Sequence, residues 1–362
     1  MPPFRAKHKR QELFRSRCFC RILAKVSSSQ PYSRWKVIAV GAAVGAAYGL
    51  FIRASIQVNL SRSVLGVISV AFLLVTPFAM GFLTTFYIER RRAQSIWMWL
   101  VLGWIPVLAS TMCMFIVAWE GLICIAMYLP IGLSCATIGG LLGGYTARVL
   151  QRSAIKNLPM ACVAVLPLLV APWEERAFLH RDLHTVESVI TIPAPAETVW
   201  RNIERVRAIR PEELTPSWTR ALGFPAPIEA TLICPGEPET FVGDPKQCAG
   251  GVRHATFAGG VLFIENIDVW QPMERLEFSI HAQTEQIPRT TLDEHVTVGG
   301  PFFDVLRGEY RLEPVNGGTR LHLTSRHRLS TSFNRYASLW IDAVMGDIQQ
   351  TILKVIQQRC EK

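Results

Sequence analysis

The hydrophobic and polar positions follow different patterns in the two halves of the chain. Between residues 35 and 173, five long hydrophobic runs lack Asp, Glu, Lys, Arg and His over their cores. These runs cover residues 35–52, 64–88, 96–118, 121–147 and 158–173. About 20 apolar residues in an α-helix cross the roughly 30 Å hydrocarbon core of a bilayer. We therefore expect residues 35–173 to form a membrane all-α bundle of about five transmembrane helices.

The first and last runs are the shortest of the five. Trp35 and Trp173 lie at their edges, as is typical of side chains anchored at the level of the lipid headgroups. The last run also contains Pro159, Pro167 and Pro172. It either spans the bilayer or only dips into the interface.

From about residue 183 the pattern changes to alternation with period two, which is typical of strands with one buried face. Val186, Ser188, Ile190 and Ile192 share one face of the first strand. A short helix with Val199 and Trp200 on its apolar side follows it. Further alternating runs lie near residues 228–234, 251–258, 260–271, 274–281, 291–298, 303–314 and 319–329. The turn at residues 316–318, Asn-Gly-Gly, predicts a hairpin between the last two.

The chain ends in a long amphipathic helix. From Tyr336, apolar residues recur at spacings of three and four through Ile356 and give one continuous stripe. Only packing of this stripe against the apolar face of the sheet buries both surfaces. We therefore predict an α+β domain over residues 183–362, an antiparallel sheet curled round the C-terminal helix, joined to the bundle by a linker at 174–182.

Composition and charge exclude several function classes. Half of the residues are hydrophobic, only 18% are charged, and the mean hydropathy is +0.24, which excludes a wholly soluble enzyme. The net charge of +10 comes from the tail at 1–34 and the bundle. Residues 174–362 have twenty Lys and Arg against twenty-five Asp and Glu, a net charge of −5. This distribution does not fit a nucleic-acid binder. The charge-free cores of the runs also disfavour ion or proton-coupled transport.

The basic residues predict an orientation. With five spans and an internal N-terminus, the inside receives the ten Lys and Arg of residues 1–36, three at residues 90–92, and Arg148, Arg152 and Lys156, sixteen in all. The outside receives only four. This positive-inside bias predicts an integral membrane protein with a cytoplasmic N-terminus and an external C-terminal domain. If the fifth run does not span, the domain stays on the cytoplasmic side.

The tail itself permits two interpretations. Between Leu13 and Val26, apolar residues fall at four-residue intervals with Arg and Lys between them. This pattern is typical of a basic amphipathic helix on an anionic leaflet. The alternative is a disordered basic tail that only sets the topology.

Glycines form stripes within two of the predicted spans. Their four-residue spacing lets helix backbones approach closely. The glycines are Gly41, Gly45, Gly49, Gly139, Gly140, Gly143 and Gly144. We interpret them as packing seams inside one bundle, with a homo-oligomer formed through the same helices as the alternative.

The C-terminal half resembles a known superfamily. A strand, Pro193-Ala194-Pro195, the segment 196–200 (Ala-Glu-Thr-Val-Trp), an antiparallel sheet and a C-terminal helix occur in this order in START-like helix-grip domains. The segments that are similar to a bacterial branch of this superfamily, the SRPBCC or polyketide cyclase/dehydrase type, are Gly250–Arg253, Phe263–Ile267, Leu306–Leu312 and Gly317–Leu321. The resemblance covers about 180 residues and implies a deep apolar cavity for a hydrophobic ligand. We expect the membrane that holds the bundle to be a bacterial cytoplasmic membrane.

Polar residues interrupt the apolar faces of several strands. They are Glu265, Glu294, Tyr310 and His327. A buried carboxyl needs a partner or a raised pKa, so these groups are either paired structural residues or ligand-binding and acid–base groups. Arg253 and Trp340 are further candidates for binding a ligand's headgroup and ring, with structural roles as the alternative.

The remaining chemical signals are few. Cys234 and Cys248 flank the loop between them and are a candidate disulfide if that loop faces an oxidising compartment. We expect no metal site, because His180 and His184 lack a third nearby ligand. The sequence has no nucleophile elbow, no phosphate-binding glycine loop and no CxxC, and we expect no cofactor.

Together these features predict a membrane-tethered domain that binds a lipid-like or polyketide-like molecule beside the bilayer. Its expected partners are membrane lipids and this hydrophobic small molecule. An enzyme of cyclase, dehydratase or hydrolase type acting on such a ligand, or a ligand-responsive membrane sensor, is the alternative.

Overall fold

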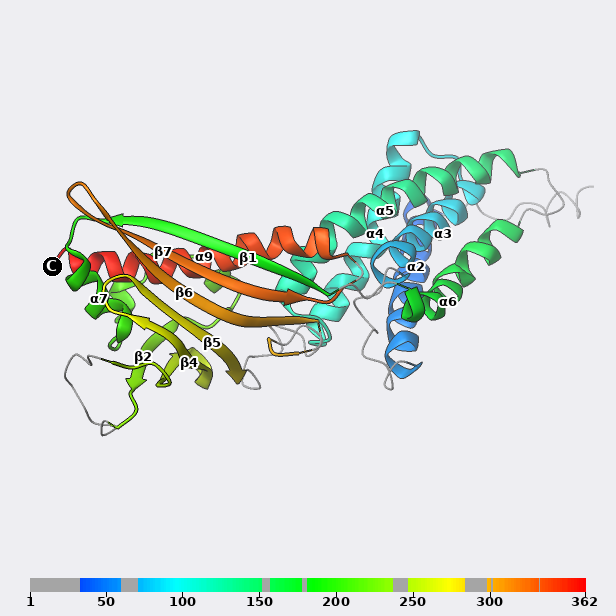
Figure 1. Ribbon diagram of the computed structural model, residues 1–362. Helices are drawn as coiled ribbons and strands as arrows, with labels where there is room; N and C mark the ends of the chain where they lie inside the picture. Colours follow the sequence, from blue (N-terminus) through cyan, green and yellow to red (C-terminus); the bar gives the residue numbers. More distant parts are fainter. Residues whose placement is uncertain are drawn as a thin grey trace, which may run out of the picture.

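The computed structural model describes residues 33–59, 71–151, 157–177, 181–236, 247–283, 298–300, 302–331 and 333–362. The helical bundle and the sheet domain lie end to end, with the long C-terminal helix leading from one towards the other (Figure 1). The predicted amphipathic segment of the tail lies outside the described residues.

The bundle consists of long apolar helices. Its elements are α2 (Arg34–Asn59), the π-helical turn η1 (Ala71–Val75), α3 (Thr76–Arg91), α4 (Ile96–Ile116), α5 (Leu122–Val149) and α6 (Leu158–Ala177). Within the described residues, four stretches are long and apolar enough to cross a membrane, namely Arg34–Ser55, Ala71–Arg91, Ile96–Ile116 and Leu122–Val149.

Five helices of this kind were expected, and the described residues contain four. In α6 the apolar stretch is Leu158–Val170, which is 13 residues long. That is shorter than the about 20 residues that span the hydrocarbon core. Still, α6 packs in the bundle: the Tyr48 hydroxyl donates to the carbonyl oxygen of Ala164 at 2.8 Å, and Met160 and Val163 contact the cluster formed by Phe82, Leu83 and Phe86.

Glycines lie where the helices of the bundle are closest. A Cβ atom on Gly139 or Gly143 of α5 would collide with the backbone oxygens of Phe78 or Phe82 in α3, and one on Gly140 would lie 2.6 Å from the Trp99 oxygen in α4. On α2, a Cβ atom on Gly41 would lie 2.8 Å from the Ile88 side chain, and Gly45 and Gly49 likewise face α3 and α4. Gly144 packs on the Trp99 ring. These seams lie between helices of the same chain.

The C-terminal domain is a seven-stranded antiparallel sheet with a long helix. Its elements are β1 (Asp182–Ile192), α7 (Ala196–Glu204), η2 (Pro211–Glu213), α8 (Trp218–Ala221), β2 (Pro227–Ile233), β3 (Val252–Phe257), η3 (Ala258–Gly260), β4 (Val261–Gln271), β5 (Arg275–Gln283), β6 (Phe303–Val315), β7 (Gly318–Leu329) and α9 (Asn334–Cys360). The strand order is β1-β7-β6-β5-β4-β3-β2. The sheet is open, with β1 and β2 as its edges. Of the predicted run 291–298, the described part is Val298, which bridges to Phe303.

The alternation of apolar positions sets the inner face of the sheet. In β1, Val186, Ser188 and Ile192 are buried, while Glu187, Val189 and Thr191 between them are exposed. In β7, Leu321, Leu323, His327 and Leu329 are buried on the same inner face. The sheet curves round α9 with this face towards the helix (Figure 1).

The end of the domain away from the bundle is a packed core. Ile192, Leu276, Leu321, Leu353 and Ile356 belong to one cluster and are fully buried. The rings of Trp200 and Trp270 meet edge to face at 5.1 Å between centroids. Cys234 and Cys248 form a disulfide within this cluster.

The other end of the domain meets the bundle. The hydroxyl of Tyr336, in the first turn of α9, donates to the carbonyl oxygen of Met127 in α5 at 2.6 Å. The start of α9 therefore lies on the N-terminal part of α5.

Gly143→Ala is expected to destabilise the bundle, because the new Cβ would meet a helix backbone that cannot move aside as a side chain can. The matched control is Gly346→Ala in α9, where no heavy atom lies within 4 Å of the added Cβ. This control should keep or raise stability by about 0.5–1 kcal/mol, because alanine favours the helix. Thermal unfolding of the full chain in detergent measures both, and equal melting temperatures would contradict a tight seam.

Reduction of the Cys234–Cys248 disulfide is expected to lower the free energy of unfolding by about 3 kcal/mol, because the cross-link closes a loop of roughly 15 residues. Denaturant unfolding with and without reductant measures this difference. Alkylation in denaturant without reductant should modify Cys113 and Cys162, which are free thiols, but neither Cys234 nor Cys248. Free thiols at both positions in native membranes would contradict the prediction.

Candidate ligand cavity

A cavity of about 310 Å³ lies between the sheet and α9, at the end of the domain that faces the bundle. On the sheet side its wall includes Phe263, Phe278, Ile280 and Leu323. On α9 it includes Trp340, Val344, Ile348 and Ile352. The alternation of the strands and the apolar stripe of α9 both direct these side chains inward. The cavity is thus a mainly apolar space with polar groups at a few positions.

The first polar group pairs Arg253 with Glu265. The register of β3 and β4 places these residues opposite each other, and their side chains form a buried ion pair. The guanidinium carbon of Arg253 lies 5.8 Å from the ring centroid of Tyr310 and 5.6 Å from that of Phe278. Three of the residues singled out from the sequence, Arg253, Glu265 and Tyr310, therefore lie together, and Glu265 and Tyr310 line the cavity.

Burial dominates the electrostatics of this group. Removal from water raises the pKa of the Glu265 carboxyl, and the charge of Arg253 offsets part of that rise. Burial also raises the pKa of Tyr310. For Arg253, burial lowers the pKa, but Glu265 and Tyr310 outweigh it and the net shift is upward. Its Nε atom is buried without a hydrogen-bond partner in the described part of the chain.

The second polar group contains His327. Its Nε2 atom lies 2.9 Å from Oγ of Ser325, and Nε2 of Gln349 on α9 donates to the same Oγ at 2.8 Å. The His327 ring stacks on Phe303 at 5.6 Å between centroids. Burial lowers the pKa of His327 to about 4, so the imidazole is neutral at pH 7.

Two atoms of this second group are not satisfied. His327 Nδ1 and Gln349 Oε1 are buried without a hydrogen-bond partner among the residues that the structure describes. Ser325 and Gln349 line the cavity. Because unsatisfied buried polar atoms cost free energy, a polar group on a ligand that reached Gln349 Oε1 would remove part of that cost.

The other residues predicted from the sequence have different positions. Trp340 lines the cavity and its ring meets that of Tyr336 edge to face at 6.4 Å. Glu294 lies outside the described residues. His184 is engaged by Asp342 at 2.7 Å, and within the described ranges no three His, Cys, Asp or Glu side chains form a group that could hold a metal ion.

The sequence interpretation missed Ser325 and Gln349. Ser325 lies two positions before His327 and therefore on the same strand face, so its polarity among apolar neighbours was a usable signal. Gln349 lies four positions after Met345 and three before Ile352, so it is on the same face of α9 as these apolar residues. A polar residue at such a position was a usable signal for the helix.

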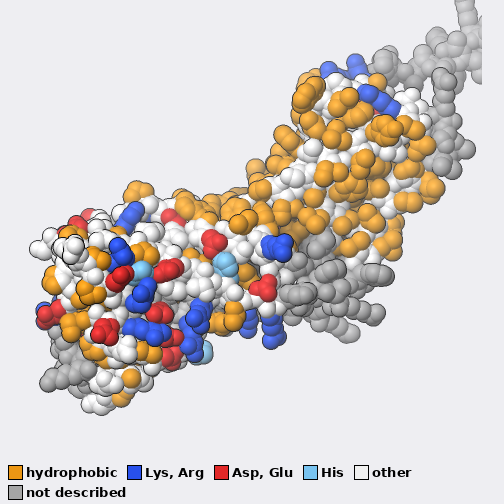
Figure 2. Space-filling model, turned by 45° about the horizontal axis from the view of Figure 1, so that its top comes forward, with side chains coloured by type: hydrophobic (Ala, Val, Ile, Leu, Met, Phe, Trp, Pro, Cys, Tyr) orange, Lys and Arg blue, Asp and Glu red, His pale blue; other side chains and the backbone are white. Residues whose placement is uncertain are grey.

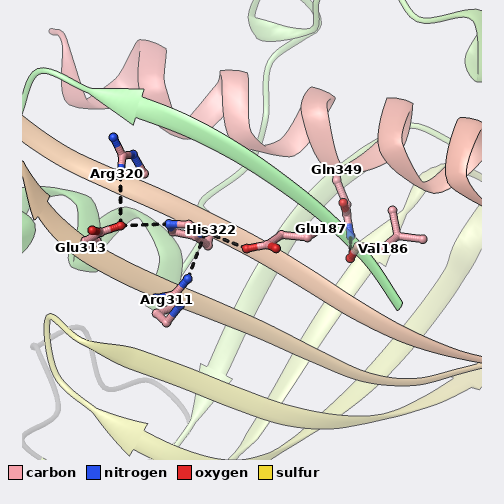
Figure 3. Close-up of polar contacts among 7 residues, drawn as sticks. All are labelled: Val186, Glu187, Arg311, Glu313, Arg320, His322 and Gln349. Atoms are coloured by element: carbon pink, nitrogen blue, oxygen red, sulfur yellow. Dashed lines mark hydrogen bonds and ion pairs between the residues drawn. The ribbon is translucent and has the colours of Figure 1, made fainter. Parts of the chain in front are cut away.

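A third polar network is separate from the cavity. Nδ1 of His322 lies 2.7 Å from Glu187, and its Nε2 lies 3.4 Å from Glu313, which also binds Arg320 (Figure 3). His322 alternates with the inward-facing Leu321 and Leu323, so this network is on the outer face of the sheet. Figure 3 also shows Gln349 reaching the carbonyl oxygen of Val186 in the edge strand, at 3.2 Å.

Comparisons with known proteins give no family assignment. No protein-family model matches the sequence, and no curated protein matches it. Several solved structures match about half of the chain. An uncharacterised protein from Rhizobium leguminosarum is 14% identical over 51% of this chain and 99% of its own, with a TM-score of 0.27. A protein from Thermus thermophilus is 17% identical over 49% and 97% of the two chains, with a TM-score of 0.28.

A protein from the dynemicin biosynthetic locus, DynU16, is 17% identical over 46% of each chain, with a TM-score of 0.23. The function of the cavity therefore rests on its own residues.

Glu265→Leu is expected to lower the free energy of unfolding by about 3–5 kcal/mol, because Arg253 would stay buried without a counter-charge. Arg253→Met combined with Glu265→Leu should recover most of that loss, because no unpaired charge remains. Denaturant unfolding followed by tryptophan fluorescence measures both variants.

The Arg320–Glu313 ion pair is the matched control, since both side chains are about 45% exposed. Glu313→Leu should cost only about 0–1 kcal/mol. If the single and double changes at the buried pair were equally destabilising, the unpaired charge of Arg253 would not be the cause of the lost stability.

Proposed function

We propose that this chain is a membrane-tethered protein whose C-terminal domain, of the SRPBCC or START-like helix-grip type, binds a lipid-like or polyketide-like hydrophobic molecule. The cavity of about 310 Å³ between sheet and α9 carries this proposal. A mostly apolar cavity with a few polar groups on its wall is the usual form of a small-molecule site. The apolar wall would supply affinity, and the Arg253–Glu265 and Ser325–Gln349 groups would orient the ligand.

The geometry favours binding over acid–base catalysis. A general base at neutral pH needs a pKa near that pH, whereas the pKa of His327 is lowered to about 4. The carboxylate of Glu265 is already engaged by Arg253. His327 instead contacts Ser325 and Phe303, so the groups predicted for catalysis form two clusters with separate partners.

We place the domain on the external side of the membrane, which requires α6, whose 20 residues extend about 30 Å, to carry the chain back across the bilayer although its apolar stretch is shorter than those of the other four helices. Arg148, near the C-terminal end of α5, binds Glu89 near the end of α3 at 2.8 Å, so these two ends lie together. The opposite end of α5 carries Met127, which contacts the domain. Figure 2 shows Lys and Arg at the end of the bundle away from the domain. A cytoplasmic location of these basic ends and the Cys234–Cys248 disulfide both support the external placement.

The tether gives this binding a physical advantage. A hydrophobic ligand partitions into the bilayer, where its local concentration is high. A cavity fixed beside the same surface meets the ligand at this raised effective concentration.

The full chain, purified from membranes and extracted with organic solvent, is expected to release an apolar molecule that mass spectrometry identifies. Val344→Trp should lose most of this molecule, because the indole would fill the space that Val344 borders on α9.

Leu339→Trp is the matched control, because Leu339 is on the same helix and 65% exposed. It should keep the molecule. Equal recovery from wild type and both variants would show that the extracted molecule is not held in the cavity, and no recovery from any of them would overturn the proposed function.

A further inference from the structure

The cavity does not end at the boundary of the sheet domain. Part of its wall is formed by Phe72 and Leu73 of η1, Met114 of α4, and Ile123, Met127 and Tyr128 of α5. All of these residues come from the ends of membrane helices that face the domain. They form one side of the opening of the cavity, which we call the mouth. The domain forms the other side with aromatic residues that include Phe257, Phe303, Phe333 and Tyr336.

The length of α5 explains how a membrane helix reaches the cavity. Its 28 residues extend about 42 Å at 1.5 Å per residue, against a hydrocarbon core of roughly 30 Å. The glycine seam at residues 139–144 packs the C-terminal part into the bundle. The N-terminal part, from Ile123 to Ile131, lines the cavity. This apolar part would face water at the membrane surface if the domain did not cover it.

Two polar contacts hold this mouth in place. The Tyr336 hydroxyl binds the Met127 carbonyl oxygen at 2.6 Å and joins α9 to α5. Arg53 of α2 forms an ion pair with Glu120 at 2.8 Å, and both side chains are at most 8% exposed. Glu120 lies in the turn between α4 and α5 and lines the cavity. The ion pair therefore fixes this turn to α2 at the rim of the mouth.

We propose that the cavity takes its ligand directly from the bilayer, through the mouth between α5 and the start of α9, and that the ligand is a single-chain membrane lipid. This inference rests on the proposed function and names its substrate class and route. The lipid passes from hydrocarbon along the apolar side chains of η1, α4 and α5 to those of the sheet and α9. Figure 2 shows hydrophobic side chains continuing along the surface from the bundle to its junction with the domain.

The size and polarity of the cavity favour a single chain. A volume of about 310 Å³ is at the lower end of the roughly 300–1,000 Å³ range of ligand sites. One flexible chain fits this space better than a lipid with two chains and a headgroup. A hydroxyl on that chain can donate to Gln349 Oε1, which lines the cavity from α9 and is buried without a partner among the described residues.

The test uses the full chain in vesicles that contain a long-chain fatty acid with a diazirine on its acyl chain. Irradiation followed by peptide mass spectrometry should locate cross-links on α9 between Trp340 and Gln349, inside the domain. Met127→Trp narrows the mouth and should lose most of these cross-links. Ile138→Trp, on the same helix at a site 55% exposed and outside the cavity wall, should retain them.

A second probe separates this inference from the proposed function. A short-chain, water-soluble diazirine fatty acid is added to the full chain held in amphipol without lipid. If this probe labels residues 340–349 but the bilayer probe labels only the bundle, the cavity binds its ligand from water and the route is overturned. If neither probe labels these residues, the proposed function also fails. Full labelling of Met127→Trp by the bilayer probe, with Ile123→Trp giving the same result, excludes the mouth as the route.

Discussion

The packing of α9 against the concave face of the sheet is the interaction on which the rest of the domain depends. Leu353 and Ile356, in the last turns of the helix, are fully buried in the core at the end away from the membrane. The middle turns of the same helix border the cavity. The first turn contacts α5 through Tyr336. One continuous apolar stripe therefore joins a packed core, a hollow and a membrane contact in series.

This arrangement explains how the domain keeps an open space without losing its fold. Core side chains are packed at the density of organic crystals, and each void costs the contacts that would fill it. The disulfide and the Trp200–Trp270 contact lie in the solid end, where they strengthen the part that has no cavity. The hollow end gains its support from the bundle, which supplies one side of the wall. The cavity therefore needs both halves of the chain, since the bundle completes the wall that the domain leaves open.

The helices and strands could be predicted from the sequence, because the periodicity of apolar residues that indicates them involves residues close together in the chain. The predicted apolar faces of β1 and α9 are the faces that are buried in the structure. Each of the four long apolar helices begins or ends within a few residues of the run predicted for it. The expected count of five long apolar helices was wrong because α6 keeps its apolar character for too few residues. Ser325 and Gln349 were missed because their pairing joins a strand to a helix, and such a contact depends on the fold. The contribution of α5 to the cavity is of the same kind, since it joins positions about 200 residues apart.

The open sheet also has consequences for self-association. An exposed edge strand offers unpaired backbone groups to which another chain can add a strand. At one edge, β2 is already bridged by Val206, which pairs with Ala230, and by Ile209, whose N–H donates to Ile228 at 2.6 Å. At the other edge, Gln349 occupies the Val186 carbonyl oxygen, and Asp342 of α9 holds His184. Both edges of the sheet are therefore partly blocked against the addition of a strand from another chain. Neighbouring copies crowded on one membrane can meet edge to edge without forming a continuous sheet.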